Sequence, residues 1–240
     1  MSSRHWRNMR IYITGVSQGI GKALALELLS NGNTVIGFGR NNTIEHACYT
    51  FVYCDLNDLN ALQKIQFEAD EEGAVLINNA GIIGPLTRIS DQDRESLLSV
   101  MTVNTLAPML LCQQFLKQVS QKTRAVIVNI SSGAANRPIP SWASYCASKI
   151  AIDRFSETIC LEELEKGRNL AVYSIAPGVV DTPMQTEIRS ADPEHFSSLN
   201  TFQELFKNKE LTDPSEVAKK LASLLFMPFD GKVIRSVREL

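Results

Sequence analysis

Three side chains in the middle of this chain could together transfer a proton, judged by their types and their spacing. Tyr145 and Lys149 stand four residues apart, and Ser132 precedes the tyrosine by thirteen residues. Positions i and i+4 share one face of a helix, so a Lys149 ammonium can lie beside the Tyr145 hydroxyl. An ordinary phenol has a pKa of about 10, and a nearby positive charge lowers that pKa. The pair alone is weak evidence, because most such tyrosines and lysines are solvated surface residues.

A second stretch that could do chemistry lies near the chain start, where Thr14 and Gly15 lead to Gly19 and Gly21. Glycines between a strand and a helix let backbone N–H groups approach a pyrophosphate at the helix N-terminus. The spacing is G-x-x-x-G-x-G rather than the commoner G-x-G-x-x-G, and a tight turn is the alternative interpretation. The position of these glycines, directly after the first predicted strand, favours a dinucleotide site.

The elements that must position these residues alternate along the chain. Strands are predicted at 10–14, 34–38, 49–54, 74–77, 125–130, 170–175 and 232–236. Helices are predicted at 19–30, 57–69, 91–104, 108–121, 144–166 and from an Asp213 cap to 226. The alternation predicts a single α/β domain over 1–240, a Rossmann-type doubly wound parallel sheet of about seven strands with helices on both faces. Ligands of such a sheet bind at the carboxyl ends of its strands.

The segment 180–209 does not fit the alternation. It has mixed polarity and contains Pro183 and Pro193. A flap over the site and a packed surface excursion are equally compatible with this composition.

Composition narrows the class of protein. The 240 residues carry a net charge of −2, which gives no general attraction to nucleic acid or to an anionic membrane. The five cysteines lack metal-ligand spacing and fit a reducing compartment, and the three histidines are too scattered for a metal site. The basic segment 1–10, with His5, leads into no apolar signal-peptide core, and no run approaches the roughly 18 apolar residues of a membrane span. We therefore expect a cytoplasmic protein with no metal, nucleic-acid or membrane partner.

The end of the second predicted strand, at Gly39 and Arg40, distinguishes the two nicotinamide dinucleotides. An acidic residue there binds the ribose hydroxyls of NAD, whereas an arginine accepts the 2′-phosphate of NADP. No Asp or Glu occurs between Asn33 and Asn42, so the sequence favours NADP(H). A solvated strand-end charge is the alternative for Arg40. Asp55, after the third strand, is either an acceptor for the adenine amine or a helix cap.

Six motifs, in order, make the chain similar to the short-chain dehydrogenase/reductase family. The resemblance covers residues 10–237, and the motifs are Thr14 to Gly21, Asn78 to Gly81, Asn104, Asn129 to Ser132, Tyr145 with Lys149, and Pro177 with Gly178. Within the family, the chain resembles sepiapterin reductases and (S)-benzoin-forming benzil reductases in residues 13–19, 131–134 and 177–185.

This resemblance implies the reduction of a ketone or 1,2-diketone carbonyl with hydride from NADPH. It implies that Tyr145 donates the proton and that Ser132 orients the carbonyl. Lys149 would hold the nicotinamide ribose and lower the tyrosine pKa, and Asn104 would hold a water that links Lys149 to solvent. The residues implied in cofactor binding are Gly15, Ser17, Gln18, Gly19, Ile20, Gly21, Arg40, Asp55, Asn79, Ala80, Gly81, Tyr145, Lys149, Pro177, Gly178, Val180 and Thr182.

The chain departs from its relatives in two places. Many NADP-dependent relatives have a basic residue where this chain has Gln18, so Arg40 and Ser17 would hold the 2′-phosphate. Animal sepiapterin reductases anchor the pterin with an aspartate near the last strand, where a gapless match places Arg235. Another alcohol dehydrogenase or ketoreductase, or a non-catalytic NADP-binding sensor on this fold, stays open as an alternative.

Four further expectations concern packing and assembly. Ser131 has the wrong spacing for the reaction and is expected to form structural hydrogen bonds. Trp142 and Met184 either wall a substrate pocket or pack in the core. Relatives commonly pair through two long helices, here 108–121 and 144–166, which implies a homodimer or homotetramer. The chemistry implies a small-molecule carbonyl substrate as the other partner.

Overall fold

A seven-stranded parallel sheet forms the centre of the protein. A computed structural model describes residues 9–240, and the strand order is β3-β2-β1-β4-β5-β6-β7. The strands are β1 (Arg10–Thr14), β2 (Thr34–Gly39), β3 (Tyr49–Tyr53), β4 (Ala74–Asn78), β5 (Ala125–Ile130), β6 (Leu170–Ala176) and β7 (Ile234–Ser236). Neighbours pair in parallel, and the expected Rossmann-type sheet is confirmed. The expectations for residues 1–8, His5 included, lie outside the described residues.

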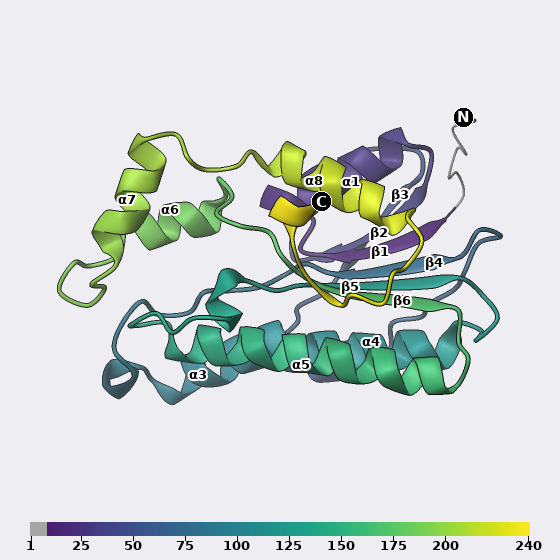
Figure 1. Ribbon diagram of the computed structural model, residues 1–240, viewed down its shortest axis with the longest axis horizontal. Coiled ribbons are helices and arrows are strands. Elements are labelled where there is room, and N and C mark those ends of the chain that lie inside the picture. The colour runs from purple at the N-terminus through teal and green to yellow at the C-terminus, as the bar shows by residue number, and fades with distance from the viewer. Residues whose placement is uncertain (1–8) are drawn as a thin grey trace.

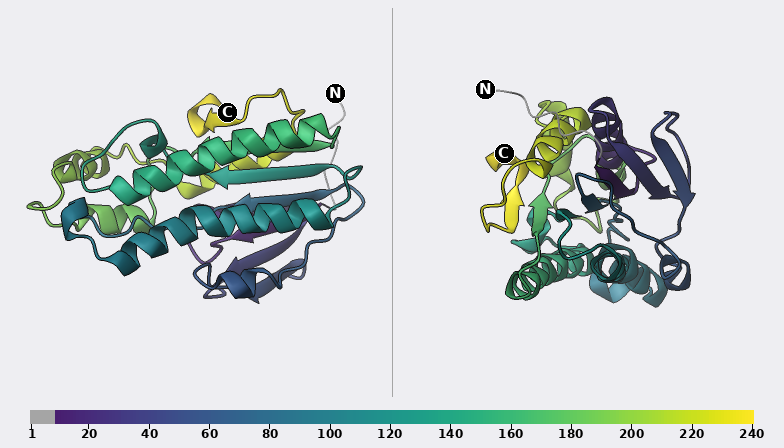
Figure 2. Two further views of the ribbon diagram at one scale, coloured as in Figure 1. Left: turned by 90° about the horizontal axis from the view of Figure 1, so that it is seen from below. Right: turned by 90° about the vertical axis from the view of Figure 1, so that its right-hand side faces the viewer.

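Helices cover both faces of this sheet (Figure 1). On one face α1 (Gly19–Ser30) lies beside α8 (Pro214–Leu225). On the other, α4 (Ala107–Gln118) and α5 (Ala143–Glu165) lie side by side, as Figure 2 shows from below. The helices α6 (Pro183–Arg189) and α7 (Leu199–Lys207) extend beyond the carboxyl ends of the strands. Short 3-10 turns are η1 (Ile89–Asp91), η3 (Gly133–Ala135) and η4 (Val237–Glu239).

Alternation along the strands divides the core into two layers. Ile11 and Ile13 of β1 pack on the α1 and α8 side, while Tyr12 between them packs on the α4 and α5 side. Val75 and Leu76 of β4 divide in the same way. Side chains on both faces are therefore buried, which explains the nearly continuous apolar runs of these strands.

The predicted helix at 57–69 is wrong for most of its length, because only one turn forms, α2 (Leu59–Leu62). Asp58 caps this turn by accepting hydrogen bonds from the amides of Asn60 and Ala61. Beyond it, the buried Ile65 and Phe67 alternate with exposed neighbours. This period of two belongs to an extended chain.

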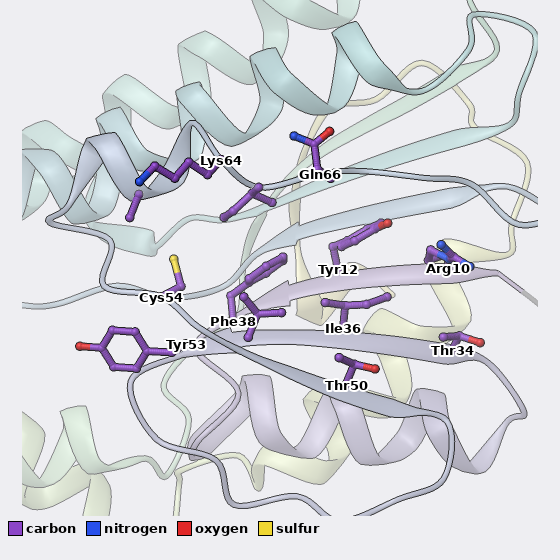
Figure 3. Close-up of a pocket in the computed structure, with 13 residues that line it drawn as sticks. Arg10, Tyr12, Thr34, Ile36, Phe38, Thr50, Tyr53, Cys54, Lys64 and Gln66 are labelled. Atoms are coloured by element: carbon purple, nitrogen blue, oxygen red, sulfur yellow. The ribbon is translucent and has the colours of Figure 1, made fainter.

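Two distant side chains hold this extended segment. The Gln118 side chain accepts from the Phe67 amide and donates to the Ile65 carbonyl, and the Tyr12 hydroxyl does the same for Glu68. These bonds satisfy backbone groups that a helix would otherwise pair. Beside this extended segment, an open pocket of about 590 Å³ lies over β1, β2 and β3 (Figure 3). The pocket is lined by Arg10, Tyr12, Thr34, Ile36, Phe38, Thr50, Val52, Tyr53, Cys54, Ala61, Lys64, Ile65 and Gln66.

The two predicted helices at 91–104 and 108–121 form one helical run. A π-helical turn, η2 (Thr102–Leu106), joins α3 (Arg94–Met101) to α4. Pro108 has no N–H for the carbonyl of Asn104, four residues back, and its ring crowds that carbonyl. A widened turn accommodates the proline without ending the helix. Asn104 therefore lies where the regular α-helix is interrupted.

This helical run, Arg94–Gln118, is long and apolar enough to cross a membrane by length and composition alone. The sequence has no uninterrupted apolar run of that length, but the average hydropathy over a window of the helix passes the test. Within the fold, 44% of that window is buried. Its buried residues, such as Leu111 and Phe115, belong to the core beneath the sheet. The helix thus has a structural place in the domain.

The segment 180–209 packs against the domain through aromatic rings. Phe196 and Phe202 are buried, with ring centroids 5.7 Å and 5.3 Å from that of Trp142. The Ser141 hydroxyl also donates a 2.5 Å hydrogen bond to the carbonyl of His195. The segment is therefore a packed surface excursion in the structure, and its movement as a flap stays a prediction.

Candidate active site

Helix α5 places Tyr145 and Lys149 on its buried face, at the carboxyl end of the sheet. Their exposed fractions are 6% and 4%. The Lys149 Nζ lies 5.6 Å from the centroid of the Tyr145 ring. It donates a 2.8 Å hydrogen bond to the carbonyl of Ile130, the last residue of β5. The end of β5 and the buried face of α5 thus meet at this point.

Ser132 approaches the same group from the end of β5. Its backbone is extended, and its Oγ caps η3 by accepting a 3.1 Å hydrogen bond from the Ala134 amide. Its side chain also interacts with the Tyr145 phenol and lowers the pKa of that phenol. The structure therefore brings together the three side chains that could move a proton to or from a substrate oxygen.

The two titratable groups of this site have pKa values shifted in opposite directions. Burial raises the pKa of Tyr145 to about 12, and the hydrogen bond with Ser132 offsets only part of this rise. The expected lowering of the tyrosine pKa is therefore wrong for the protein's own groups, because desolvation of the phenolate outweighs the interaction with Ser132. Burial lowers the pKa of Lys149 to about 8, and the field of Asp153 opposes that change. Near neutral pH the phenol is protonated, and Lys149 is the group closer to titration.

Asn104 is fixed by three hydrogen bonds at the π-helical turn. Its Oδ1 accepts from the Ile82 amide at 2.9 Å, and its Nδ2 donates to the Ile82 carbonyl at 2.8 Å and to the Ser148 hydroxyl at 3.1 Å. A Cβ added to Gly81 would lie 3.2 Å from Asn104 Oδ1 and 3.5 Å from Lys149 Nζ. Asn104 and Lys149 thus meet beside the Gly81 backbone. The water-holding role of Asn104 stays a prediction.

The glycine loop closes so tightly on the turn after β4 that only glycine fits. A Cβ at Gly21 would lie 2.2 Å from the Gly15 carbonyl oxygen, and a Cβ at Gly15 would lie 2.9 Å from Ala80 Cα. Gly15 and Gly19 also have φ values of 75° and 57°, in the left-handed region. No side chain caps the N-terminus of α1. Its first amides and the bare loop therefore fit a pyrophosphate that contacts backbone.

Thr14 joins this loop to the Asn79-Ala80 turn. Its hydroxyl accepts from the Asn79 and Ala80 amides, both at 3.0 Å. The Asn79 side chain donates to the carbonyls of Thr14 and Gly15 at 2.9 Å and 3.1 Å. Sequence reasoning missed the role of the Thr14 hydroxyl, although the residue opens the glycine motif. The Asn79 side chain supports the loop, and contact of this turn with a ribose stays a prediction.

The residues expected at the phosphate end lie on neighbouring loops. Arg40 follows β2, is exposed, and forms no ion pair among the residues that the structure describes. The Ser17 carbonyl accepts a 2.9 Å hydrogen bond from the Thr43 hydroxyl, which ties the Arg40 loop to the glycine loop. Gln18 is the N-cap residue of α1 without a side-chain cap bond. This arrangement leaves Arg40 available for a phosphate.

Asp55 and Ile20 have structural contacts in this region. Asp55 Oδ1 accepts a 3.0 Å hydrogen bond from the Asn57 amide in the turn before α2. Asp58 and not Asp55 is the N-cap of that helix, so the capping alternative is wrong, and contact of Asp55 with adenine stays a prediction. Ile20, the second residue of α1, packs partly buried against the core.

The segment after β6 passes over the glycine loop. Gly178 has a φ of 84°, and Val180 is buried and bridges Thr212 on the way to α8. A Cβ at Gly19 would lie 3.2 Å from the methyl group of Thr182, the N-cap of α6. The stretch that begins at Pro177 and Gly178 therefore reaches the entrance of α1, where a nicotinamide group could be covered.

An apolar cluster adjoins Tyr145. The Trp142 ring meets the Tyr145 ring edge-on at 5.5 Å, and Met184 packs partly buried on the same cluster. The indole N–H of Trp142 and the Ser131 hydroxyl are buried without a hydrogen-bond partner among the described residues. The expected structural hydrogen bonding at Ser131 is made by its amide, which donates to the Ile175 carbonyl at 2.9 Å, and not by its hydroxyl. Trp142 therefore packs in this apolar cluster and also contacts the Tyr145 ring.

The sequence pattern of the short chain dehydrogenases matches residues 9–193, and the chain belongs to the short-chain dehydrogenase/reductase family, an oxidoreductase family that binds a nicotinamide cofactor. It is 35% identical over 242 residues to the benzil reductase ((S)-benzoin forming) of Bacillus subtilis, covering 96% of this chain and 99% of the relative. It is 34% identical over 231 residues to the Bacillus cereus benzil reductase, covering 90% and 93%. A solved short chain dehydrogenase/reductase from Saccharomyces cerevisiae has a TM-score of 0.80 at 26% identity and covers 95% of each chain.

Proposed function

We propose that the protein is an NADPH-dependent carbonyl reductase that transfers hydride to a ketone or 1,2-diketone, with Tyr145 as proton donor. The observation that carries the proposal is the meeting of Tyr145, Ser132 and Lys149 at the carboxyl end of the sheet. Similarity to two benzil reductases supports a benzil-like substrate.

The bound cofactor supplies a hydride to the carbonyl carbon. Tyr145 gives its phenolic proton to the carbonyl oxygen as negative charge grows there. Ser132 donates a hydrogen bond to the same oxygen and so orients the carbonyl against the phenol. A pKa of about 12, raised by burial, keeps Tyr145 protonated before the transfer. The Lys149 ammonium then favours the phenolate that the transfer leaves behind.

The cofactor preference follows from charge at the end of β2. Arg40 is exposed and has no ion pair among the described residues, and no carboxylate stands beside it in 34–41. A guanidinium matches the geometry of a phosphate and has no comparable match to a ribose diol. Arg40 and the neighbouring Ser17 would hold the 2′-phosphate of NADPH.

Among carbonyl substrates, the geometry favours a benzil-like compound over a pterin. The apolar cluster of Trp142, Phe196 and Phe202 adjoins the phenol, and such rings suit an aryl group. Arg235 is ion-paired with Asp230 and lies over the Tyr173 ring at 5.8 Å. A cation at this position does not offer the carboxylate with which animal sepiapterin reductases anchor a pterin.

A substrate panel tests the proposed function. Purified protein is mixed with NADPH or NADH and with benzil, sepiapterin or a simple aliphatic ketone, and cofactor consumption is followed by absorbance. Consumption of NADPH with benzil, faster than with NADH, is the expected result. Binding of NADPH without consumption for any carbonyl would instead indicate a sensor. Turnover of the aliphatic ketone alone would favour the alternative alcohol dehydrogenase or ketoreductase.

We also propose a homodimer or homotetramer that forms through α4 and α5. Leu106, Leu161 and Leu164 on this side have exposed fractions of 45%, 62% and 70%. Exposed apolar side chains of this size commonly mark an interface. Between α4 and α5 lies a groove of about 620 Å³ whose lining includes Met109 and Leu110.

Light scattering tests this assembly. Replacing Leu161 and Leu164 with Asp is expected to reduce the mass toward that of one chain, because charges would enter an apolar interface. The matched control is Leu26→Asp on α1, where Leu26 is 46% exposed and lies on the opposite face. A wild-type protein that is monomeric at micromolar concentration contradicts the proposal.

A further inference from the structure

A buried carboxylate lies one helical turn beyond Lys149. Asp153 is four residues further along α5, on the same face, with an exposed fraction of 8%. Its Oδ1 accepts a 2.6 Å hydrogen bond from the Ser174 hydroxyl of β6. Among residues 9–240 it forms no ion pair within 4.0 Å. A buried charge without a direct partner is costly, which raises the question of what it does.

Asp153 and Lys149 reach adjacent points of the sheet. Lys149 bonds the carbonyl of Ile130 on β5, and Asp153 bonds Ser174 on β6. The register pairs Ser174 with Asn129, the residue next to Ile130, so the two anchor points are diagonal neighbours. The ammonium and the carboxylate therefore share the space between α5 and the sheet, too far apart for an ion pair but close enough to interact through a medium of low polarity.

The groups around this pair are neutral near physiological pH. Asn129 donates to the Ser156 hydroxyl at 2.8 Å and accepts from Asn78 at 2.8 Å. The Cys112 thiol beside them has its pKa raised to about 12 by burial, and Tyr145 is protonated for the same reason. Asp153 is thus the charge that opposes the effect of burial on Lys149.

We propose that Asp153 is a positioning residue for the reduction, whose negative charge holds Lys149 in the ammonium form at working pH. This inference rests on the proposed function, because the ammonium is what would hold the nicotinamide ribose and favour the phenolate. The carboxylate is far enough from Lys149 to leave its hydrogen bonds free for that work. Ser174 fixes the carboxylate in this place.

The pH dependence of kcat/KM for benzil with NADPH tests the role of Asp153. Asp153→Asn keeps an acceptor for Ser174 and removes the charge, so burial would act on Lys149 without opposition. The alkaline limb of the profile is expected to move to lower pH by about one unit, since a charge within several ångströms shifts a pKa by that order. At pH 8 the variant should lose roughly fivefold in rate relative to wild type, whereas at pH 6 the two should differ by less than about threefold.

Two matched variants separate charge from structure. Ser174→Ala removes the hydrogen bond and leaves the carboxylate, so its alkaline limb should stay with that of wild type. Asp153→Glu keeps the charge and should do the same. An Asp153→Asn protein that folds and keeps the wild-type limb overturns the proposal.

If Asp153→Asn does not fold, Asp153→Ser provides a smaller neutral replacement for the same measurement. Neutral variants that all fail to fold, beside a folded Asp153→Glu, would make Asp153 a structural residue and equally overturn the proposal. A wild-type protein without reductase activity would remove the proposed function itself. Normal wild-type activity with an unmoved limb removes only the role of Asp153.

Discussion

The pocket over β1, β2 and β3 and the group around Tyr145 differ in how fully their polar side chains are paired. In the pocket, Arg10 is paired with Glu68 and with Asp70, although its Nε has no partner among the described residues, and the Tyr12 hydroxyl is bonded to the backbone of Glu68. The Cys54 thiol has its pKa raised to about 11 by burial and by nearby carboxylates, which makes it a poor nucleophile.

Around Tyr145 the side chains are buried but less fully paired. Lys149 has a single hydrogen bond, to the Ile130 carbonyl, and the Trp142 N–H and Ser131 hydroxyl have no partner among the described residues. Buried polar groups that the fold leaves unsatisfied mark the places where a ligand can interact. The pairing of the side chains, rather than the size of the pocket, is therefore the reason for placing the proposed chemistry at Tyr145.

The strongest test of this contrast is Tyr145→Phe. The variant loses one hydroxyl and keeps the ring contact with Trp142, so turnover should fall by roughly 10²–10⁴-fold, the usual contribution of a positioned acid. Affinity for NADPH should change little, because the glycine loop and Arg40 are untouched. Steady-state kinetics and a fluorescence titration of NADPH measure the two effects. A variant with near wild-type turnover would show that another group supplies the proton.

Lys149→Ala should lose turnover and also weaken cofactor binding, since Lys149 would serve both.

The wild type offers a related test by pH. The pKa of Lys149 is lowered by burial to about 8, so the ammonium is present below that pH and is lost as pH rises through it. The kcat/KM of the wild type should therefore fall between about pH 7 and pH 9. A profile that stays flat to pH 10 would contradict the assignment.

Arg40→Asp should reverse the cofactor preference at an intermediate cost. A hydrogen bond to a charged group contributes about 1.5–3 kcal/mol, so NADPH binding should weaken by roughly 10- to 100-fold while NADH binding improves. Kd values for both cofactors provide the measurement. A wild type that already prefers NADH would remove the role of Arg40 as the phosphate ligand.

The smallest effects are expected in the pocket. Lys64→Ala and Val52→Ala change two exposed lining residues and should leave turnover within about twofold and stability within about 0.5 kcal/mol. Kinetics and thermal melting measure both. A large loss of activity from either substitution would mean that the contrast between the two regions is wrong.

Sequence alone predicted most of the sheet and the position of α1, because strands buried on both faces and a helix that follows a glycine loop leave local signals. The region 57–69 was not predictable in the same way. Leu62 and Ile65 fit a helical spacing, and the extended form is stabilised by Gln118 and Tyr12, which are distant in the chain.

The candidate site shows the same division. The helical spacing of Tyr145 and Lys149 predicted that they share a face, and the resemblance to the family added Ser132 to this pair. The pKa of Tyr145 was not predictable, because its direction depends on burial, including contact with Trp142. Asp153 could be noted four residues after Lys149, but its position became informative only with Ser174 opposite it.

The π-helical turn at Thr102–Leu106 sets the phase of a whole helix. Each residue turns an α-helix by about 100°, so one extra residue in a turn rotates everything after it by that angle. The turn therefore lets Asn104 bond Ser148 of α5 while Leu111 and Phe115 still face the sheet. Deleting a single residue between 102 and 106 would restore an even helix and turn one of these two faces away from its partners, whereas a deletion in an exposed loop leaves helix phase unchanged.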